Sequence, residues 1–151
     1  PQNPSLIATQ TTTGEVLVFD YTRHASNEKD APRPELRLAG GHTEEGTNLL
    51  VALFCSLYLH SSFKSYGLSW NQLQKGLLLS ASQDKTICLW DVNNTPQDGV
   101  LPYKTRYAVH EGIIEDVAWH LHNPHYFGSV GDDKKFILYV FLNFTNCFKK
   151  V

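Results

Sequence analysis

The sequence contains no methionine and only three cysteines among its 151 residues. Cys55, Cys88 and Cys147 form no Cys-x-x-Cys pair, so their number and spacing fit neither a zinc cage nor a disulfide framework. This cysteine usage favours a reducing compartment. Because the chain begins at Pro1 and has no methionine, we expect it to be a fragment of a longer protein.

The sequence also lacks a charge surplus and a long hydrophobic run. Its 13 Lys and Arg residues stand against 15 Asp and Glu residues, so we expect no direct binding of nucleic acid and none of an anionic membrane. The most apolar stretch, Leu49–Leu59, is too short to span a bilayer, which takes roughly 20 helical residues. The remaining composition, 42% hydrophobic and 19% charged, is typical of a soluble globular domain.

An internal repeat becomes visible when Trp70 is aligned with Trp119. Fourteen residues after each tryptophan stands an aspartate, Asp84 or Asp133, and six residues further on stands an aromatic residue. The segment LLLSASQDKTICLW thus matches YFGSVGDDKKFILY, and LIATQTTTGEVLVFD near the N-terminus has the same shape. The sequence contains three copies of one unit, two of them incomplete.

Each copy is expected to form two short strands joined by a tight polar turn, with a further strand on either side. A unit of about 40 to 45 residues, with Gly-His before it and Trp-Asp after its third strand, is typical of a WD-repeat propeller blade. We therefore predict an all-β fold: a partial WD40 β-propeller of about two and a half blades out of an expected seven, each blade a four-stranded antiparallel sheet.

Two segments do not match the repeat. Residues 47–65 form a hydrophobic insertion, for which translated intron sequence and a genuine inserted helix are the two explanations, and residues 140–151 form an atypical tail. The predicted organisation is 1–46 (the end of one blade, with the outer strand and Gly-His of the next), 47–65 (insertion), 66–110 (a blade), 111–139 (an incomplete blade) and 140–151 (tail). Open sheet edges and half-covered apolar faces predict that the isolated chain is poorly soluble or associates.

Four polar or aromatic positions recur in the second and third copies. We predict two buried hydrogen-bond chains, in which the aspartate accepts, the histidine links it to the serine hydroxyl, and the aromatic residue reaches the serine. Tyr139 replaces a tryptophan and has a different reach. The two sets are His42, Ser80, Asp84 and Trp90, then His110, Ser129, Asp133 and Tyr139.

The same residue types suggest two other chemistries. Ser, His and Asp together are the residues of a hydrolase triad, but there is no Gly-x-Ser-x-Gly segment, and a tandem structural motif explains the trio better. His120, His122 and His125 are the densest histidine cluster, yet the Asn123-Pro124 turn and the lack of a cysteine or carboxylate partner argue against a metal site. We expect no catalytic residue, no metal and no cofactor.

Acidic residues precede the predicted inner strands. In a propeller such positions open onto the face around the central channel, where converging carboxylates can hold an Arg or Lys of a bound peptide. Ordinary solvated charges are the alternative. The candidate partner-binding residues on this top face are Glu45, Glu115, Asp116 and Tyr66.

Several segments closely resemble one family. NPSLIATQTTTGEVLVFDYTRH, ELRLAGGH, YGLSWN, LLSASQDKTICLWDVNNTPQDG and HEGIIEDVAWHLHNPHYFGSVGDD are similar to the histone-binding WD-repeat proteins of the retinoblastoma-binding and chromatin-assembly-factor small-subunit class, plant members above all. The resemblance covers residues 1–46 and 66–139.

The resemblance implies a nuclear, seven-bladed, non-enzymatic scaffold that escorts core histones. Its expected partners are histones or their basic tails and subunits of chromatin assembly, deacetylase, remodelling and Polycomb-type complexes. Glu45 and Glu115 align with acidic positions that in the family hold a basic residue of a peptide. The family's other histone site, built on an N-terminal helix and a late blade, has no counterpart in this sequence.

Two other functions remain open. One is a truncated or mis-spliced, nonfunctional variant, to which the insertion and the tail point. The other is a substrate receptor of a ubiquitin ligase, which in many WD proteins carries an Arg two residues after the Trp-Asp pair. That position is Asn93 here, so the motif fails in this copy.

Overall fold

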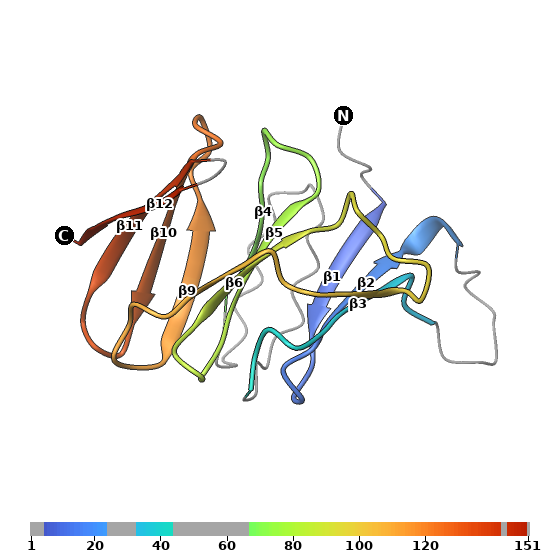
Figure 1. The fold of residues 1–151 in the computed structure, drawn as a ribbon, viewed down its shortest axis with the longest axis horizontal. Coiled ribbons are helices and arrows are strands. Elements are labelled where there is room, and N and C mark those ends of the chain that lie inside the picture. The colour runs from blue at the N-terminus through green and yellow to red at the C-terminus, as the bar shows by residue number, and fades with distance from the viewer. Residues whose placement is uncertain (1–4, 24–32, 44–66, 143–144, 151) are drawn as a thin grey trace.

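The computed structural model describes residues 5–23, 33–43, 67–142 and 145–150, with side chains as far as Phe141. These residues form twelve strands in three four-stranded sheets that lie in a row, with the first and third sheets at opposite ends (Figure 1). No helix within these ranges is long and apolar enough to cross a membrane. The three sheets correspond to the three copies of the repeat.

The second and third sheets follow one plan. The second has the order β4 (Leu68–Trp70), β5 (Leu77–Ala81), β6 (Ile87–Asp91) and β8 (Thr105–Tyr107), and all its neighbours are antiparallel. The third has the order β9 (Ile114–Trp119), β10 (Tyr126–Gly131), β11 (Phe136–Leu142) and β12 (Thr145–Lys150), again antiparallel.

The first sheet is built differently. It contains β1 (Leu6–Gln10), β2 (Val16–Asp20) and β3 (Leu36–Leu38) as antiparallel neighbours, and a short 3-10 helix, Tyr21–Arg23, follows β2. Its fourth strand, β7 (Val100–Leu101), comes from the connection between β6 and β8 and lies parallel to β3. The expectation of purely antiparallel blades is therefore wrong at this one pair, because the connection reaches back to satisfy the backbone edge of β3.

The segment that the repeat pattern sets apart as a tail takes part in the third sheet. Residues 140–142 continue β11, and Thr145–Lys150 pairs with β11 as β12. An outer strand contributes mainly backbone hydrogen bonds, so a sequence unlike the repeat can still fill the position. The insertion 47–65 lies outside the described residues, and the segment limits inferred from the repeat stay predictions.

Two hydrophobic cores hold the three sheets together. Strand alternation places apolar side chains on both faces of β5 and β6, so the second sheet is covered on both sides. One core lies between the first and second sheets and includes Val16, Val18, Leu78 and Trp90. The other lies between the second and third sheets and includes Leu79, Leu89, Phe127 and Tyr139.

One polar side chain interrupts the first core. Gln10, at the end of β1, is 5% exposed, and neither atom of its amide has a hydrogen-bond partner in the described part of the chain. The repeat places Gln10 where the second sheet has the buried Ala81. A buried amide without partners destabilises a fold by about 1 to 3 kcal/mol.

Replacing Gln10 with the similarly sized leucine should therefore stabilise the chain. We expect Gln10→Leu to raise the free energy of unfolding by about 1 to 2 kcal/mol, measured by urea denaturation. Gln10→Glu is the matched control and should lower it, because it buries a charge at the same place. A Gln10→Leu variant less stable than the original chain would contradict this account of Gln10.

Candidate functional site

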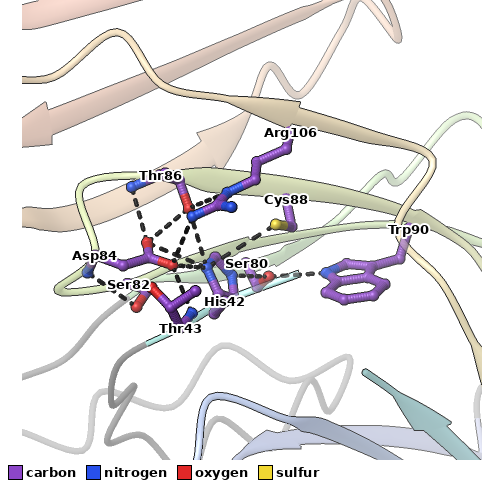
Figure 2. Close-up of polar contacts among 9 residues, drawn as sticks. All are labelled: His42, Thr43, Ser80, Ser82, Asp84, Thr86, Cys88, Trp90 and Arg106. Atoms are coloured by element: carbon purple, nitrogen blue, oxygen red, sulfur yellow. Dashed lines mark hydrogen bonds and ion pairs between the residues drawn. The ribbon is translucent and has the colours of Figure 1, made fainter. Parts of the chain in front are cut away.

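The first of the two polar chains lies in the second sheet and joins four side chains from separate segments (Figure 2). Nε1 of Trp90 donates to Oγ of Ser80 at 2.8 Å, and Oγ of Ser80 lies 2.7 Å from Nε2 of His42. Nδ1 of His42 is 3.2 Å from Oδ2 of Asp84. Ser80 and Trp90 are fully buried, so these bonds replace contacts with water.

The donors and acceptors determine the order of protons along this chain. The indole of Trp90 can only donate, so Oγ of Ser80 accepts from it and its own proton points to Nε2 of His42. The neutral imidazole then carries its proton on Nδ1 and donates it to Asp84. Every group in the chain is satisfied with His42 neutral and Asp84 ionised.

The Asp84 carboxylate gathers further donors that the sequence analysis missed. It accepts hydrogen bonds from the backbone N–H of Thr43 at 3.0 Å, from Oγ1 of Thr86 at 2.6 Å and from Nη2 of Arg106 at 3.3 Å. Burial by itself would raise the pKa of Asp84, but the hydrogen bonds, led by those from His42 and Thr86, hold this pKa well below its usual range. Thr86, two residues after the aspartate, was the visible signal for such a turn.

The third sheet contains the second polar chain. Nδ1 of His110 lies 2.9 Å from Oδ1 of Asp133, and its Nε2 lies 2.7 Å from Oγ of Ser129. Oγ of Ser129 donates to the hydroxyl oxygen of Tyr139 at 3.1 Å, so the tyrosine reaches the serine but accepts where the indole of the second sheet donates. Burial opposes ionisation of Asp133, but the N–H of Glu111 and the ring of His110 lower the pKa of its carboxyl to about 2.

The size of the residue before each histidine complements that of the aromatic residue on the third strand of the same copy. A Cβ atom on Gly41 would lie 2.6 Å from Cη2 of Trp90, so only glycine leaves room for the indole ring there. In the third sheet the smaller Tyr139 replaces the tryptophan, and Val109 stands in the place of Gly41 and packs against the same core. The Gly-His pair is therefore a packing requirement of the tryptophan.

The aspartates also hold the hairpin turns. Lys85 and Lys134, each directly after its aspartate, have φ values of 65° and 59°, in the left-handed region that L-residues disfavour. Oδ1 of Asp84 accepts from the N–H of Thr86, and Oδ1 of Asp133 accepts from that of Lys135, so each carboxylate brackets the strained lysine. At the corresponding turn of the first sheet stands Gly14, for which φ of 79° is unstrained.

The geometry of the Ser-His-Asp sets resembles that of a hydrolase triad in distances only. A catalytic serine must present its oxygen to a substrate, whereas Ser80 is fully buried and its oxygen already accepts from Trp90. Ser129 is 2% exposed and is bonded to Tyr139. Both sets hold strands together.

Glu115 and Asp116 are the top-face candidates that the structure describes, whereas Glu45 and Tyr66 lie outside the described residues. In the register of β9 against β10, Asp116 lies opposite Val130 and Ile114 opposite Gly131, so Glu115 is the extra residue of a β-bulge. Glu115 is half-buried and Asp116 is exposed. A bulge redirects its side chain out of the regular alternation, which is a common device beside binding sites.

The Asp116 carboxyl packs against backbone of the neighbouring sheet. Its Oδ1 accepts from the N–H of Val117 at 2.8 Å, and a Cβ atom on Gly67 would approach this oxygen to 2.5 Å. Partial loss of water at this contact raises the pKa of Asp116. The edge strand β9 therefore carries two adjacent carboxyl groups: that of Glu115 at the bulge, and that of Asp116 against the backbone of the neighbouring sheet.

The remaining candidates have local contacts. The N–H of His122 donates to Nδ1 of His120 at 3.0 Å in a turn after β9, and Nδ1 of His125 lies 3.1 Å from the carbonyl oxygen of Phe141. Among the described residues no group of three or more His, Cys, Asp or Glu side chains is arranged to hold a metal ion. Asn93, at the position where ubiquitin-ligase receptors carry an arginine, donates from Nδ2 to the carbonyl oxygen of Lys75 at 2.9 Å.

Comparison with known proteins places the fold. No protein-family model matches the sequence. Among the many solved structures that are similar is the crystal structure of the β-propeller domain of Cps50 (Swd1) from Myceliophteria thermophila, with a TM-score of 0.65 and 15% sequence identity. The match covers 99% of this chain and 36% of that chain, so the present chain spans about a third of the length of that protein.

This likeness shows the fold alone. The described residues form part of a β-propeller built from four-stranded sheets, as the repeat predicted.

The polar chain in the second sheet predicts a large effect for a small change. Ser80→Ala removes the acceptor of the Trp90 indole and the donor to His42, leaving two buried groups unpaired. We expect a loss of roughly 2 to 4 kcal/mol in the free energy of unfolding, measured by urea denaturation. Ser69→Ala, which removes a single hydrogen bond from the N–H of Trp119, is the control and should lose about 1 kcal/mol. Equal losses of stability in the two variants would contradict the hydrogen-bonded chain from Trp90 to Asp84.

The lowered pKa of Asp133 predicts a dependence on pH. Its folded-state pKa of about 2 lies below the ordinary value of 3.8, so the ionised carboxylate stabilises the fold above pH 4, and this contribution is lost as the pH falls towards 2. The difference in melting temperature between the original chain and Asp133→Asn should therefore have its largest value at pH 7 and decrease between pH 4 and pH 2. A difference that stays constant from pH 7 to pH 2 would show that the charge of Asp133 is unimportant.

Proposed function

We propose that this chain is part of a non-enzymatic histone-binding scaffold of the WD-repeat class, working in the nucleus with chromatin-assembly and chromatin-modifying complexes. The propeller fold supports the interaction role. The finer assignment is supported by the segments VFDYTRH and HEGIIEDVAWHL, which resemble the histone-binding class far more specifically than a generic WD repeat does.

The observation that carries the proposal is the position of Glu115. The bulge at Glu115 interrupts the alternation of β9, an edge strand of the third sheet, within the segment that resembles the histone-binding class. A half-buried carboxylate holds a guanidinium or ammonium group more strongly than an exposed one, because water screens the pair less. Asp116, exposed beside it, adds negative charge that attracts a basic peptide.

The ligand follows from this chemistry. Two adjacent acids and no basic surplus select a cationic segment, and the Lys- and Arg-rich tail of a histone is such a segment. In this proposal Glu115 holds one basic side chain of the tail by charge-assisted hydrogen bonds, and Glu45 and Tyr66 are the residues expected to join it. Binding of this kind weakens as salt concentration rises.

The test is the affinity of the chain for a labelled basic histone-tail peptide, measured by fluorescence anisotropy. Glu115→Gln keeps the shape of the side chain and removes its charge, so we expect the Kd to rise roughly 5- to 150-fold, which corresponds to about 1 to 3 kcal/mol. Asp98→Asn makes the same charge change in the exposed loop before β7 and should leave the Kd unchanged.

Each outcome has a distinct meaning. Unchanged affinity in Glu115→Gln would remove Glu115 from the contact. Failure of the original chain to bind the peptide better than a version with every Lys and Arg replaced by Gln would overturn the histone-binding proposal itself.

A further inference from the structure

The loop from β6 to β7 carries an exposed threonine directly before a proline. Residues 93–95 and 97–98 of this loop are exposed, and Thr95 and Pro96 belong to no helix or strand. The hydroxyl of Thr95 donates to the carbonyl oxygen of Val92 at 3.2 Å. Because this hydrogen bond stays within the loop, the hydroxyl can be released without opening a sheet.

The pair Thr95-Pro96 is the one place in the sequence where a serine or threonine precedes proline. Proline disfavours a helical backbone in the residue before it, which suits the extended segment that a protein kinase binds around its acceptor. One class of kinases accepts a hydroxyl only when proline follows it. Every described serine is at least partly buried. The other exposed threonines of the described ranges are followed by residues other than proline: Thr12, Thr13, Thr22 and Thr43.

The loop is in contact with the β4–β5 turn, residues 71–76. The N–H of Val92 donates to the carbonyl oxygen of Gly76 at 2.9 Å, and Nδ2 of Asn93 donates to that of Lys75 at 2.9 Å. A Cβ atom on Gly76 would collide with the side-chain amide of Asn93, so the two segments touch at this point. Since Val92 also accepts the hydroxyl of Thr95, this hydroxyl lies beside the same turn.

The charges around Thr95 favour an added phosphate. The acid at the base of the loop, Asp91, is paired with Lys104 at 2.9 Å, and the carboxylate of Asp98 accepts from a backbone N–H at the start of β7. Lys75 is exposed and forms no ion pair with another described residue. A phosphothreonine carries about −1.5 to −2 charges at pH 7 and three acceptor oxygens. Lys75 is therefore the uncompensated cation within reach of such a group.

We propose that Thr95 is a phosphorylation site for a proline-directed protein kinase, and that its phosphate pairs with Lys75 and ties the β6–β7 loop to the β4–β5 turn. In the transfer, the hydroxyl oxygen of Thr95 bonds to the γ-phosphorus of ATP while the bond to the leaving ADP breaks, and the hydroxyl proton passes to the catalytic aspartate of the kinase. The hydrogen bond to Val92 is given up. The ion pair that replaces it joins the segment that enters β5 to the segment that leaves β6.

The first test is phosphorylation of the chain by a purified mitogen-activated protein kinase with Mg²⁺ and ATP, located by mass spectrometry of tryptic peptides. We expect one phosphate in the peptide of residues 86–104, on Thr95. Pro96→Ala should slow the reaction at least about tenfold, because the kinase then lacks the ring that it selects. Pro102→Ala makes the same change at an exposed position of the same connection and should leave the rate unchanged.

Three results would overturn the assignment of Thr95. They are a phosphate on another residue, no phosphate at all, and equal rates for the original chain and Pro96→Ala. The second result is read beside a synthetic peptide of residues 88–102, treated with the same kinase. A modified peptide next to an unmodified chain would show that the fold hides Thr95.

The pairing with Lys75 is tested by the melting temperatures of the phosphorylated and unphosphorylated chain at low salt. We expect the phosphate to raise the melting temperature by about 1 to 2 °C, as an exposed ion pair does, and Lys75→Gln to remove this rise. Lys85→Gln removes an exposed charge from the β5–β6 turn, at the opposite end of β5, and should keep the rise (Figure 1). An unchanged or lowered melting temperature on phosphorylation of the original chain, or a rise that survives Lys75→Gln, would overturn the pairing.

Discussion

The buried indole N–H of Trp90 is the constraint on which the second sheet depends. It has a single proton to donate and no access to water, so an acceptor must be supplied by the fold. That acceptor, Ser80, needs His42 to take its own proton, and His42 in turn needs the carboxylate of Asp84. The need to satisfy this one N–H group therefore fixes the relative positions of β5, β6, the turn between them, and the segment with His42, about 40 residues earlier in the chain.

The same requirement explains why glycine precedes histidine in one copy and not in the other. Gly41 leaves space for the Trp90 ring, whereas Val109 accompanies the smaller Tyr139. Tyrosine keeps a hydrogen bond with the serine but accepts it, because its hydroxyl can both donate and accept, so the proton order that tryptophan imposes is not required in the third sheet. The two copies therefore keep both the packing and the aromatic–serine hydrogen bond through paired differences, glycine with tryptophan in one and valine with tyrosine in the other.

Most of the inner architecture was predictable from the sequence, because spacing in a repeat is set by strand length and turn geometry. The alignment of Trp70 with Trp119 predicts the hairpins and the residues of both polar chains. The outer strands β7 and β12 were not predictable, since their pairing rests on backbone groups that every residue carries. The donors from Thr43 and Arg106 and the bulge at Glu115 depend on register between strands, which the residue pattern leaves open.

The position of the acidic pair follows from the geometry of a propeller. Rotation about the axis of a propeller leaves corresponding ends of all inner strands on the same side of the ring. Glu115 and Asp116 lie near the start of β9, so within the described residues this chain contributes one pair of carboxyl groups to that side. Because charges that converge on one ligand act together, acids at the same end of neighbouring inner strands strengthen the hold on a multiply basic peptide.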